Sequence, residues 1–283
     1  MTRIALGQLA VRAADPAANL AAVAAVAARA GSEGADLLLL PEMWATGLDL
    51  ADAPRLAAEV RRLVLPALPA LARRHRLHLA GSLPVADRTG AVFNTFVVVP
   101  PDGPATAVYR KVHLFSPWQE HRFVRGGHRA ATCAFPWGDA GIGICYDIRF
   151  PELFRLHALA GATHLLVSAL WGAERVEHWR VLLRARAVEN QCWVVACGGV
   201  DPARGAYAGR STVVDPWGEV TCELGDGEDV ALATIDLAAV AAARARLPAL
   251  ADRRPAVYHR PPRRVRPGGG APAGADPPPP GPL

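Results

Sequence analysis

The sequence contains only one lysine, and arginine carries nearly all of its other positive charge. Of the 31 lysine and arginine residues, Lys111 is the only lysine. A solvent-exposed position accepts either residue, whereas a compact ammonium group on a thin flexible stem fits sites that a broad planar guanidinium cannot enter. Position 111 is therefore a candidate functional site.

Cysteine is also scarce, and its spacing excludes two common uses of this residue. Five cysteines at irregular intervals do not predict a disulfide framework in a chain of 283 residues. Cys192 and Cys197 are separated by four residues, which fits neither a usual zinc-binding spacing nor a CxxC redox motif. We interpret these two cysteines, together with Cys133 and Cys222, as small core residues, and we expect the protein to reside in the reducing cytoplasm. A reversible redox disulfide between Cys192 and Cys197 is the alternative.

No segment has the pattern of an export signal or a membrane span. The N-terminal residues lack the charged, apolar and cleavage regions of a signal peptide. The alanine-rich run "NLAAVAAVAARAG" is interrupted by Arg29 and is too short to cross a bilayer. We therefore expect neither export nor membrane association.

A basic stripe of the kind that binds nucleic acid is missing as well. The formal net charge is +5 and the pI is near 9.3. Six arginines and one acid follow Asp252, however, while residues 1–252 contain 25 basic and 25 acidic residues. Because the body of the chain is neutral and has no basic run with interleaved aromatics, we expect no nucleic-acid partner.

What the chain does contain is an alternation of strand-like and helix-like segments, which predicts an α/β fold. With 51% hydrophobic residues, it is long enough to bury a large core. We expect one domain over residues 1–254 and, over residues 255–283, a disordered tail rich in proline, glycine and arginine. Strands are predicted at 2–11, 35–42, 77–85, 91–100, 108–114, 141–147, 163–170, 192–200, 210–216 and 229–237, and helices at 19–31, 55–74, 151–162 and 177–190.

Three polar residues occur at the ends of apolar strand-like runs: Glu42, Lys111 and Cys145. Ligands collect at the carboxyl ends of strands in open α/β architectures, so these residues can converge on one pocket. A carboxylate can take the proton of a thiol, and an ammonium group can stabilise both a thiolate and an oxyanion. Taken singly, Glu42 could be a helix cap, Lys111 a solvent-facing charge and Cys145 a core residue. Together they predict a nucleophilic site.

The stretches "LLLLPEMWATG", "YRKVHLF" and "GIGICYDIRFPE" resemble, in this order, the nitrilase superfamily of carbon-nitrogen hydrolases, whose catalytic triad is Glu-Lys-Cys. The resemblance covers about residues 2–250. It implies a four-layer α-β-β-α sandwich that assembles as a homodimer or larger homo-oligomer. It also implies that Glu42 is the general base, Lys111 the triad lysine and Cys145 the nucleophile, while Glu120 orients the lysine and the substrate. No metal or organic cofactor is required.

Within the superfamily, the chain looks most like the ω-amidase branch, which hydrolyses the terminal amide of α-ketoglutaramate and similar short dicarboxylate monoamides. Such a reaction passes through a cysteine thioester and releases ammonia, and the backbone N–H of Tyr146 is expected to help hold the oxyanion. Arg149 is a candidate partner for the substrate carboxylate, and an ion pair with Asp147 is its alternative role. Phe115, Trp118 and Trp171 are expected to shape the pocket.

The sequence leaves several other functions open. An amidase branch acting on deaminated glutathione shares the "CYDxRFPE" pattern. A nitrilase or an N-carbamoyl amino acid hydrolase would use the same three residues. A non-catalytic binding protein on the same fold is the alternative from a different class.

Overall fold

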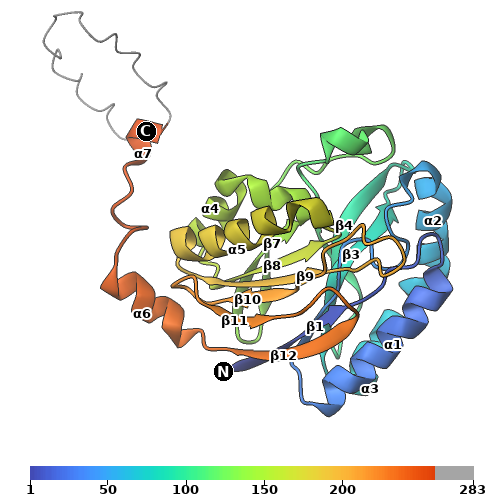
Figure 1. Ribbon diagram of the computed structural model, residues 1–283, viewed down its shortest axis with the longest axis horizontal. Coiled ribbons are helices and arrows are strands. Elements are labelled where there is room, and N and C mark those ends of the chain that lie inside the picture. The colour runs from blue at the N-terminus through green and yellow to red at the C-terminus, as the bar shows by residue number, and fades with distance from the viewer. Residues whose placement is uncertain (259–283) are drawn as a thin grey trace, which may run out of the picture.

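The computed structural model describes residues 1–258, which build two mixed β-sheets of six strands each (Figure 1). The first sheet has the order β12-β1-β2-β3-β4-β5 and the second has the order β11-β10-β9-β8-β7-β6. The first sheet consists of β1 (Thr2–Gln8), β2 (Leu37–Leu39), β3 (His78–Ala86), β4 (Val92–Val99), β5 (Thr106–Arg110) and β12 (Asp229–Ile235). The second consists of β6 (Thr132–Phe135), β7 (Gly138–Ile144), β8 (His164–Ala169), β9 (Trp193–Gly198), β10 (Thr212–Val214) and β11 (Val220–Glu223).

Helices cover the outer face of each sheet, so the molecule has four layers in the order α-β-β-α (Figure 1). The first sheet is covered by α1 (Pro16–Ser32), α2 (Ala53–Glu59) and α3 (Leu68–His75). The second is covered by α4 (Pro151–Leu159) and α5 (Val176–Asn190), while α6 (Ala238–Arg246) and α7 (Pro255–Tyr258) follow the last strand. The predicted four-layer sandwich is confirmed. Within residues 1–258, no helix is long and apolar enough to cross a membrane.

Alternate residues of the central strands face two different apolar cores. Leu37 and Leu39 of β2 point between the sheets, where they belong to one cluster with Ile142 of β7. Leu38 points the other way and belongs to a second cluster with Val23 of α1. Side chains of a strand alternate between its faces, so a strand covered on both sides must be apolar throughout. This explains the unbroken run "DLLLLP".

Some predicted elements differ from those observed. The single helix expected over residues 55–74 is divided into α2, a π-helical turn (Val60–Val64) and α3, because Pro66 and Pro69 cannot occupy the interior of a continuous helix. β6 and β11 were not predicted; both are edge strands of only four residues, and at least half of the side chains in each are exposed.

Two further predictions need correction. Lys111 does not lie within a strand, because β5 ends at Arg110. The first four residues of the predicted disordered tail form the short helix α7, and the rest of that tail lies outside the described residues.

The strand order brings the candidate residues to one end of the sandwich. At this end lie the carboxyl ends of the parallel strands, which are β1, β2 and β3 in one sheet and β7, β8 and β9 in the other. Glu42 follows β2, Lys111 follows β5 and Cys145 follows β7. The site is thus assembled from both sheets.

Candidate active site

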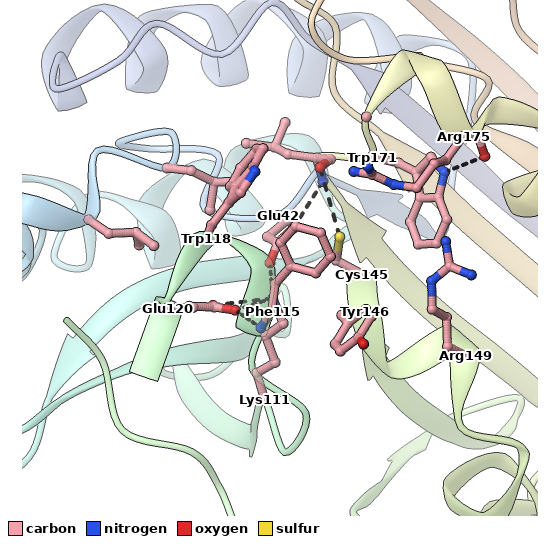
Figure 2. Close-up of a pocket in the computed structure, with 14 residues that line it drawn as sticks. Glu42, Lys111, Phe115, Trp118, Glu120, Cys145, Tyr146, Arg149, Trp171 and Arg175 are labelled. Carbon is pink, nitrogen blue, oxygen red and sulfur yellow. Dashed lines mark hydrogen bonds and ion pairs between the residues drawn. The ribbon is translucent and has the colours of Figure 1, made fainter. Parts of the chain in front are cut away.

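The candidate residues surround one pocket with an empty volume of about 450 Å³ (Figure 2). All nine residues expected at the site from the sequence line it. The complete lining consists of Glu42, Leu48, Leu50, Lys111, Phe115, Trp118, Glu120, Cys145, Tyr146, Arg149, Leu170, Trp171, Gly172 and Arg175.

Lys111 lies between two buried carboxylates. Its Nζ is 2.8 Å from Oε1 of Glu42 and 3.0 Å from Oε2 of Glu120, and its side chain is only 3% exposed. Burial opposes the charge of the ammonium, but Glu42 and Glu120 outweigh this effect and raise the pKa of Lys111 above its usual range. The lysine therefore stays protonated. Its compact ammonium group forms ion pairs with two carboxylates at once, and a planar guanidinium in the same volume would favour a two-point contact with only one of them.

Glu42 is held in one orientation by hydrogen bonds to both of its oxygens. Oε1 accepts from Nδ2 of Asn94 at 2.8 Å in addition to Lys111, and Oε2 accepts from the backbone N–H of Leu170 at 3.0 Å. Asn94 is fully buried in β4, and its backbone carbonyl oxygen accepts a hydrogen bond from the backbone N–H of Lys111. Asn94 was not predicted as a site residue, although it stands out in the sequence as a polar residue in the apolar strand "AVFNTFVVVP".

Glu120 is positioned by the loop that follows Lys111. Two short 3₁₀ turns, Ser116–Trp118 and Glu120–Arg122, fold this loop back so that the carboxylate points inward and is only 2% exposed. Its Oε2 also accepts from the backbone N–H of Phe115 at 2.6 Å. The structure therefore places Glu120 beside the lysine, as the resemblance implied.

Cys145 stands at a strained turn directly after β7. Its φ of 47° lies in the left-handed region, which is costly for a residue with a side chain and is often found at functional sites. Its Sγ is 3.8 Å from the carbonyl oxygen of Leu170. Burial, with Glu42 adding to it, raises the pKa of the Cys145 thiol well above its usual value, although Lys111 acts in the opposite direction. The resting Cys145 is therefore a thiol.

The glycines before Cys145 serve packing. A Cβ at Gly141 would lie 2.5 Å from His157, and one at Gly143 would lie 2.7 Å from Phe154. Both neighbours belong to α4, so these glycines let the helix approach the strand closely.

The walls of the pocket combine aromatic rings with two cations (Figure 2). The Phe115 ring lies 5.0 Å from that of Tyr146, and the Arg149 guanidinium lies 4.9 Å from the ring centre of Trp171. Arg175, which the sequence analysis did not identify, places its guanidinium 5.3 Å from the ring centre of Phe115. It also forms an ion pair with the exposed Glu174.

The ion pair between Arg149 and Asp147, considered from the sequence, is not found among the described residues. Arg149 contacts Nδ1 of His178 at 3.2 Å. Asp147 is fully buried and accepts hydrogen bonds from Tyr109 and His113. The Arg149 guanidinium is thus available to the pocket.

The remaining cysteines lie away from this chemistry. Cys192 and Cys197 are free and fully buried in one apolar core cluster, and burial raises the pKa of each to about 12. Inert buried thiols of this kind do not suit a redox pair. Within the described part of the chain, no group of three histidine, cysteine or acidic side chains could hold a metal ion.

Comparison with known proteins identifies the family of this chain. The model of the carbon-nitrogen hydrolase family matches residues 3–245. A 2-oxoglutaramate amidase from Bacillus subtilis is 39% identical over 229 residues, which cover 80% of this chain and 88% of the relative. An omega-amidase from Mus musculus is 32% identical over 251 residues, which cover 85% of this chain and 91% of the relative.

Solved structures support the same family assignment. A CN-hydrolase superfamily protein from Xanthomonas campestris, with an arsenic adduct in its active site, matches with a TM-score of 0.83 and 30% identity over 89% of this chain and 97% of that one. A member of branch 10 of the nitrilase superfamily from Saccharomyces cerevisiae matches with a TM-score of 0.79 and 30% identity over 87% and 94% of the two chains. This chain belongs to the carbon-nitrogen hydrolase family and is a hydrolase of carbon-nitrogen bonds other than peptide bonds.

Proposed function

We propose that the protein is an ω-amidase that hydrolyses the terminal amide of 2-oxoglutaramate (α-ketoglutaramate) or a similar short dicarboxylate monoamide. The observation that carries this proposal is the pocket itself, which joins Glu42, Lys111 and Cys145 to the cationic Arg149. The relatives named 2-oxoglutaramate amidase and omega-amidase support the choice of substrate.

The first half of the reaction acylates Cys145. Glu42 takes the thiol proton as Sγ attacks the amide carbon, and the oxyanion is held by Nζ of Lys111 and the backbone N–H of Tyr146. The carbon-nitrogen bond then breaks, Glu42 returns its proton to the leaving nitrogen, and ammonia departs. The product is a thioester on Cys145.

The second half releases the acid. Glu42, again a carboxylate, takes a proton from water as the water oxygen attacks the thioester carbon, and Lys111 holds the new oxyanion. The carbon-sulfur bond breaks, and the proton on Glu42 returns to the sulfur. Glu120 contributes by holding the Lys111 ammonium in place. General acid-base catalysis supplies roughly 10²- to 10⁴-fold, and one oxyanion donor roughly 10²- to 10³-fold.

Substrate selection is assigned to the walls of the pocket. A guanidinium can bind a carboxylate through two parallel hydrogen bonds. Arg149 is available for this role because, among the described residues, it contacts His178 and forms no ion pair with an acidic side chain. Phe115, Tyr146 and Trp171 offer apolar surface to the methylene groups between the amide and the carboxylate.

We also propose a homodimer or a larger homo-oligomer. Exposed apolar side chains on α4 and α5 support this assembly, since a patch of this kind commonly marks a protein interface. They are Leu156, Leu159, Val181 and Val188, which are 56%, 47%, 64% and 51% exposed. A location in the cytoplasm and the absence of a nucleic-acid partner remain predictions from the sequence.

The proposed function is tested by measuring ammonia release from a panel of substrates. The panel contains 2-oxoglutaramate, succinamate, deaminated glutathione, a nitrile and an N-carbamoyl amino acid, with Cys145→Ala as the control. A preference for 2-oxoglutaramate or succinamate that is lost in the control supports the ω-amidase. Preference for another member assigns that rival specificity instead. Silence across the panel with a Cys145 that iodoacetamide does not label favours a binding protein.

A further inference from the structure

Lys111 and Cys145 come from different sheets. Lys111 follows β5 at the edge of the first sheet, and Cys145 follows β7 in the second. Within the described residues the two sheets share no strand ladder, and an isolated bridge between Ala10 and Val200 joins other segments, so no ladder sets the distance between Lys111 and Cys145. A misplacement of about 1 Å in an active site can cost about 10²-fold in rate. Side-chain contacts between the two segments must therefore fix their relative position.

One buried carboxylate links the two segments. Asp147 is 0% exposed, and each of its oxygens accepts from two donors. Oδ2 accepts from the backbone N–H of Ile144 at 2.9 Å and from the hydroxyl of Tyr109 at 2.8 Å. Oδ1 accepts from the backbone N–H of His113 at 3.0 Å and faces Nδ1 of the same residue at 2.8 Å. The carboxylate is thus saturated with hydrogen bonds from both sheets.

The partners of Asp147 flank the catalytic residues. Ile144 directly precedes Cys145, and its hydrogen bond closes the turn in which Cys145 has a positive φ. His113 lies two residues after Lys111. Tyr109 lies two residues before Lys111, and its hydroxyl also accepts from the backbone N–H of Val112 at 3.1 Å. The network therefore holds the backbone on both sides of the lysine.

The histidine continues this connection toward solvent. The His113 side chain is 27% exposed, and its ring stacks on Phe150 with a centroid distance of 3.7 Å and an angle of 7°. Phe150 ends the turn that begins at Cys145. His113 thus touches the nucleophile turn twice, once through Asp147 and once through this ring.

From this arrangement we infer that Asp147 is a positioning residue that keeps Cys145 and the Tyr146 N–H aligned with Lys111, and that His113 is its partner on the lysine side. The inference rests on the roles proposed above for Lys111 and Cys145. A carboxylate fits this position because its oxygens accept hydrogen bonds, and the Tyr109 hydroxyl and two backbone N–H groups all donate to it. An amide at this position would turn an NH₂ group toward two donors and break the link on one side.

The first test is Asp147→Asn, which keeps the shape of the side chain. We expect kcat on 2-oxoglutaramate to fall by about 10²-fold with KM within about threefold, since only the transition state needs the alignment. We also expect iodoacetamide to label Cys145 at least about tenfold more slowly, because Sγ leaves the reach of Glu42. The matched control is Gln191→Leu, which removes a buried hydrogen bond to Ala243 and a partly buried one to Leu247, both outside the pocket. The control should lower the melting temperature without changing kcat or labelling.

Labelling makes this test independent of the proposed function. A wild-type protein that hydrolyses no amide would refute the ω-amidase, yet the labelling rates would still decide the role of Asp147. A folded Asp147→Asn protein with unchanged kcat and unchanged labelling would overturn the inference.

A second pair of variants decides the question if Asp147→Asn does not fold. Asparagine can place its Nδ2 near the position of the His113 Nδ1, so His113→Asn keeps a donor to Asp147 while His113→Ala loses it. We expect His113→Asn to retain at least about tenfold more kcat than His113→Ala. Equal kcat values in the two variants would contradict the positioning role.

Discussion

Replacing Lys111 with arginine tests whether the site needs a compact ammonium group. Nζ of Lys111 lies within 3.2 Å of three carboxylate oxygens on Glu42 and Glu120 while the residue is only 2% exposed. An arginine keeps the charge but favours a planar, two-point contact with one carboxylate. It cannot place a single donor between Glu42, Glu120 and the oxyanion.

The magnitude follows from the two roles of the lysine. Loss of one oxyanion donor costs roughly 10²- to 10³-fold in kcat. The larger side chain should cost about 1–3 kcal/mol in stability through overpacking. Lys111→Met, in contrast, leaves two buried carboxylates without their cation, which should cost about 3–5 kcal/mol. At about 2–4 °C per kcal/mol, this lowers the melting temperature by roughly 6–20 °C.

The assay combines ammonia release with thermal unfolding for wild type, Lys111→Arg and Lys111→Met. We expect the arginine variant to lose activity while keeping most of its stability, and the methionine variant to lose both. Turnover by Lys111→Arg within tenfold of wild type would refute the reasoning, because a guanidinium would then serve as well as the ammonium.

Four further predictions concern other residues. Arg149→Gln should raise KM for 2-oxoglutaramate at least about tenfold, the value of one charge-assisted hydrogen bond, while leaving turnover of a neutral short amide unchanged; an equal effect on both amides would contradict carboxylate binding. Asn94→Leu should lower kcat about tenfold by removing one of the two hydrogen bonds to Oε1 of Glu42, and steady-state kinetics showing a change in KM alone would argue against this. Labelling of Cys145 by iodoacetamide should accelerate with pH from about pH 6 to about pH 9, because its raised pKa keeps it a thiol; a plateau below pH 7 would indicate a preformed thiolate. Burial lowers the pKa of His164 to about 4, so the unfolded chain binds this proton more readily, and the free energy of unfolding should fall as the pH drops from 6.5 to 4, by on the order of 3 kcal/mol. Denaturant titrations of His164→Gln should show a shallower fall, and an identical pH dependence would exclude this origin.

The architecture was predictable because its strands are covered on both faces. Continuous apolar runs such as "DLLLLP" are visible in the sequence, and the order of strands and helices follows from them. The resemblance supplied the arrangement in layers. The edge strands β6 and β11 escaped prediction because each has only four residues, too few to show a clear periodicity. The division of the helix after α2 depends on Pro66 and Pro69, which helical periodicity alone does not reveal.

The candidate active site was predictable where a reactive side chain interrupts an apolar run. Glu42, Lys111 and Cys145 all satisfy this condition, and the structure brings them together. The backbone N–H of Leu170, which holds Glu42, has no signature in a sequence. Asp147 was considered from the sequence as an ion-pair partner of Arg149. Spacing along the chain does not reveal that Asp147 instead faces Tyr109 and His113 across the two sheets.

The most direct test of the whole account is to trap the acyl-enzyme. Wild-type protein is mixed with 2-oxoglutaramate, quenched rapidly in acid and analysed by mass spectrometry of its peptides. We predict that the peptide containing Cys145 gains the mass of the acyl group left after loss of ammonia, and that Cys145→Ala shows neither this adduct nor ammonia release. Ammonia release that continues in Cys145→Ala, with no adduct in the wild type, would contradict the central claim.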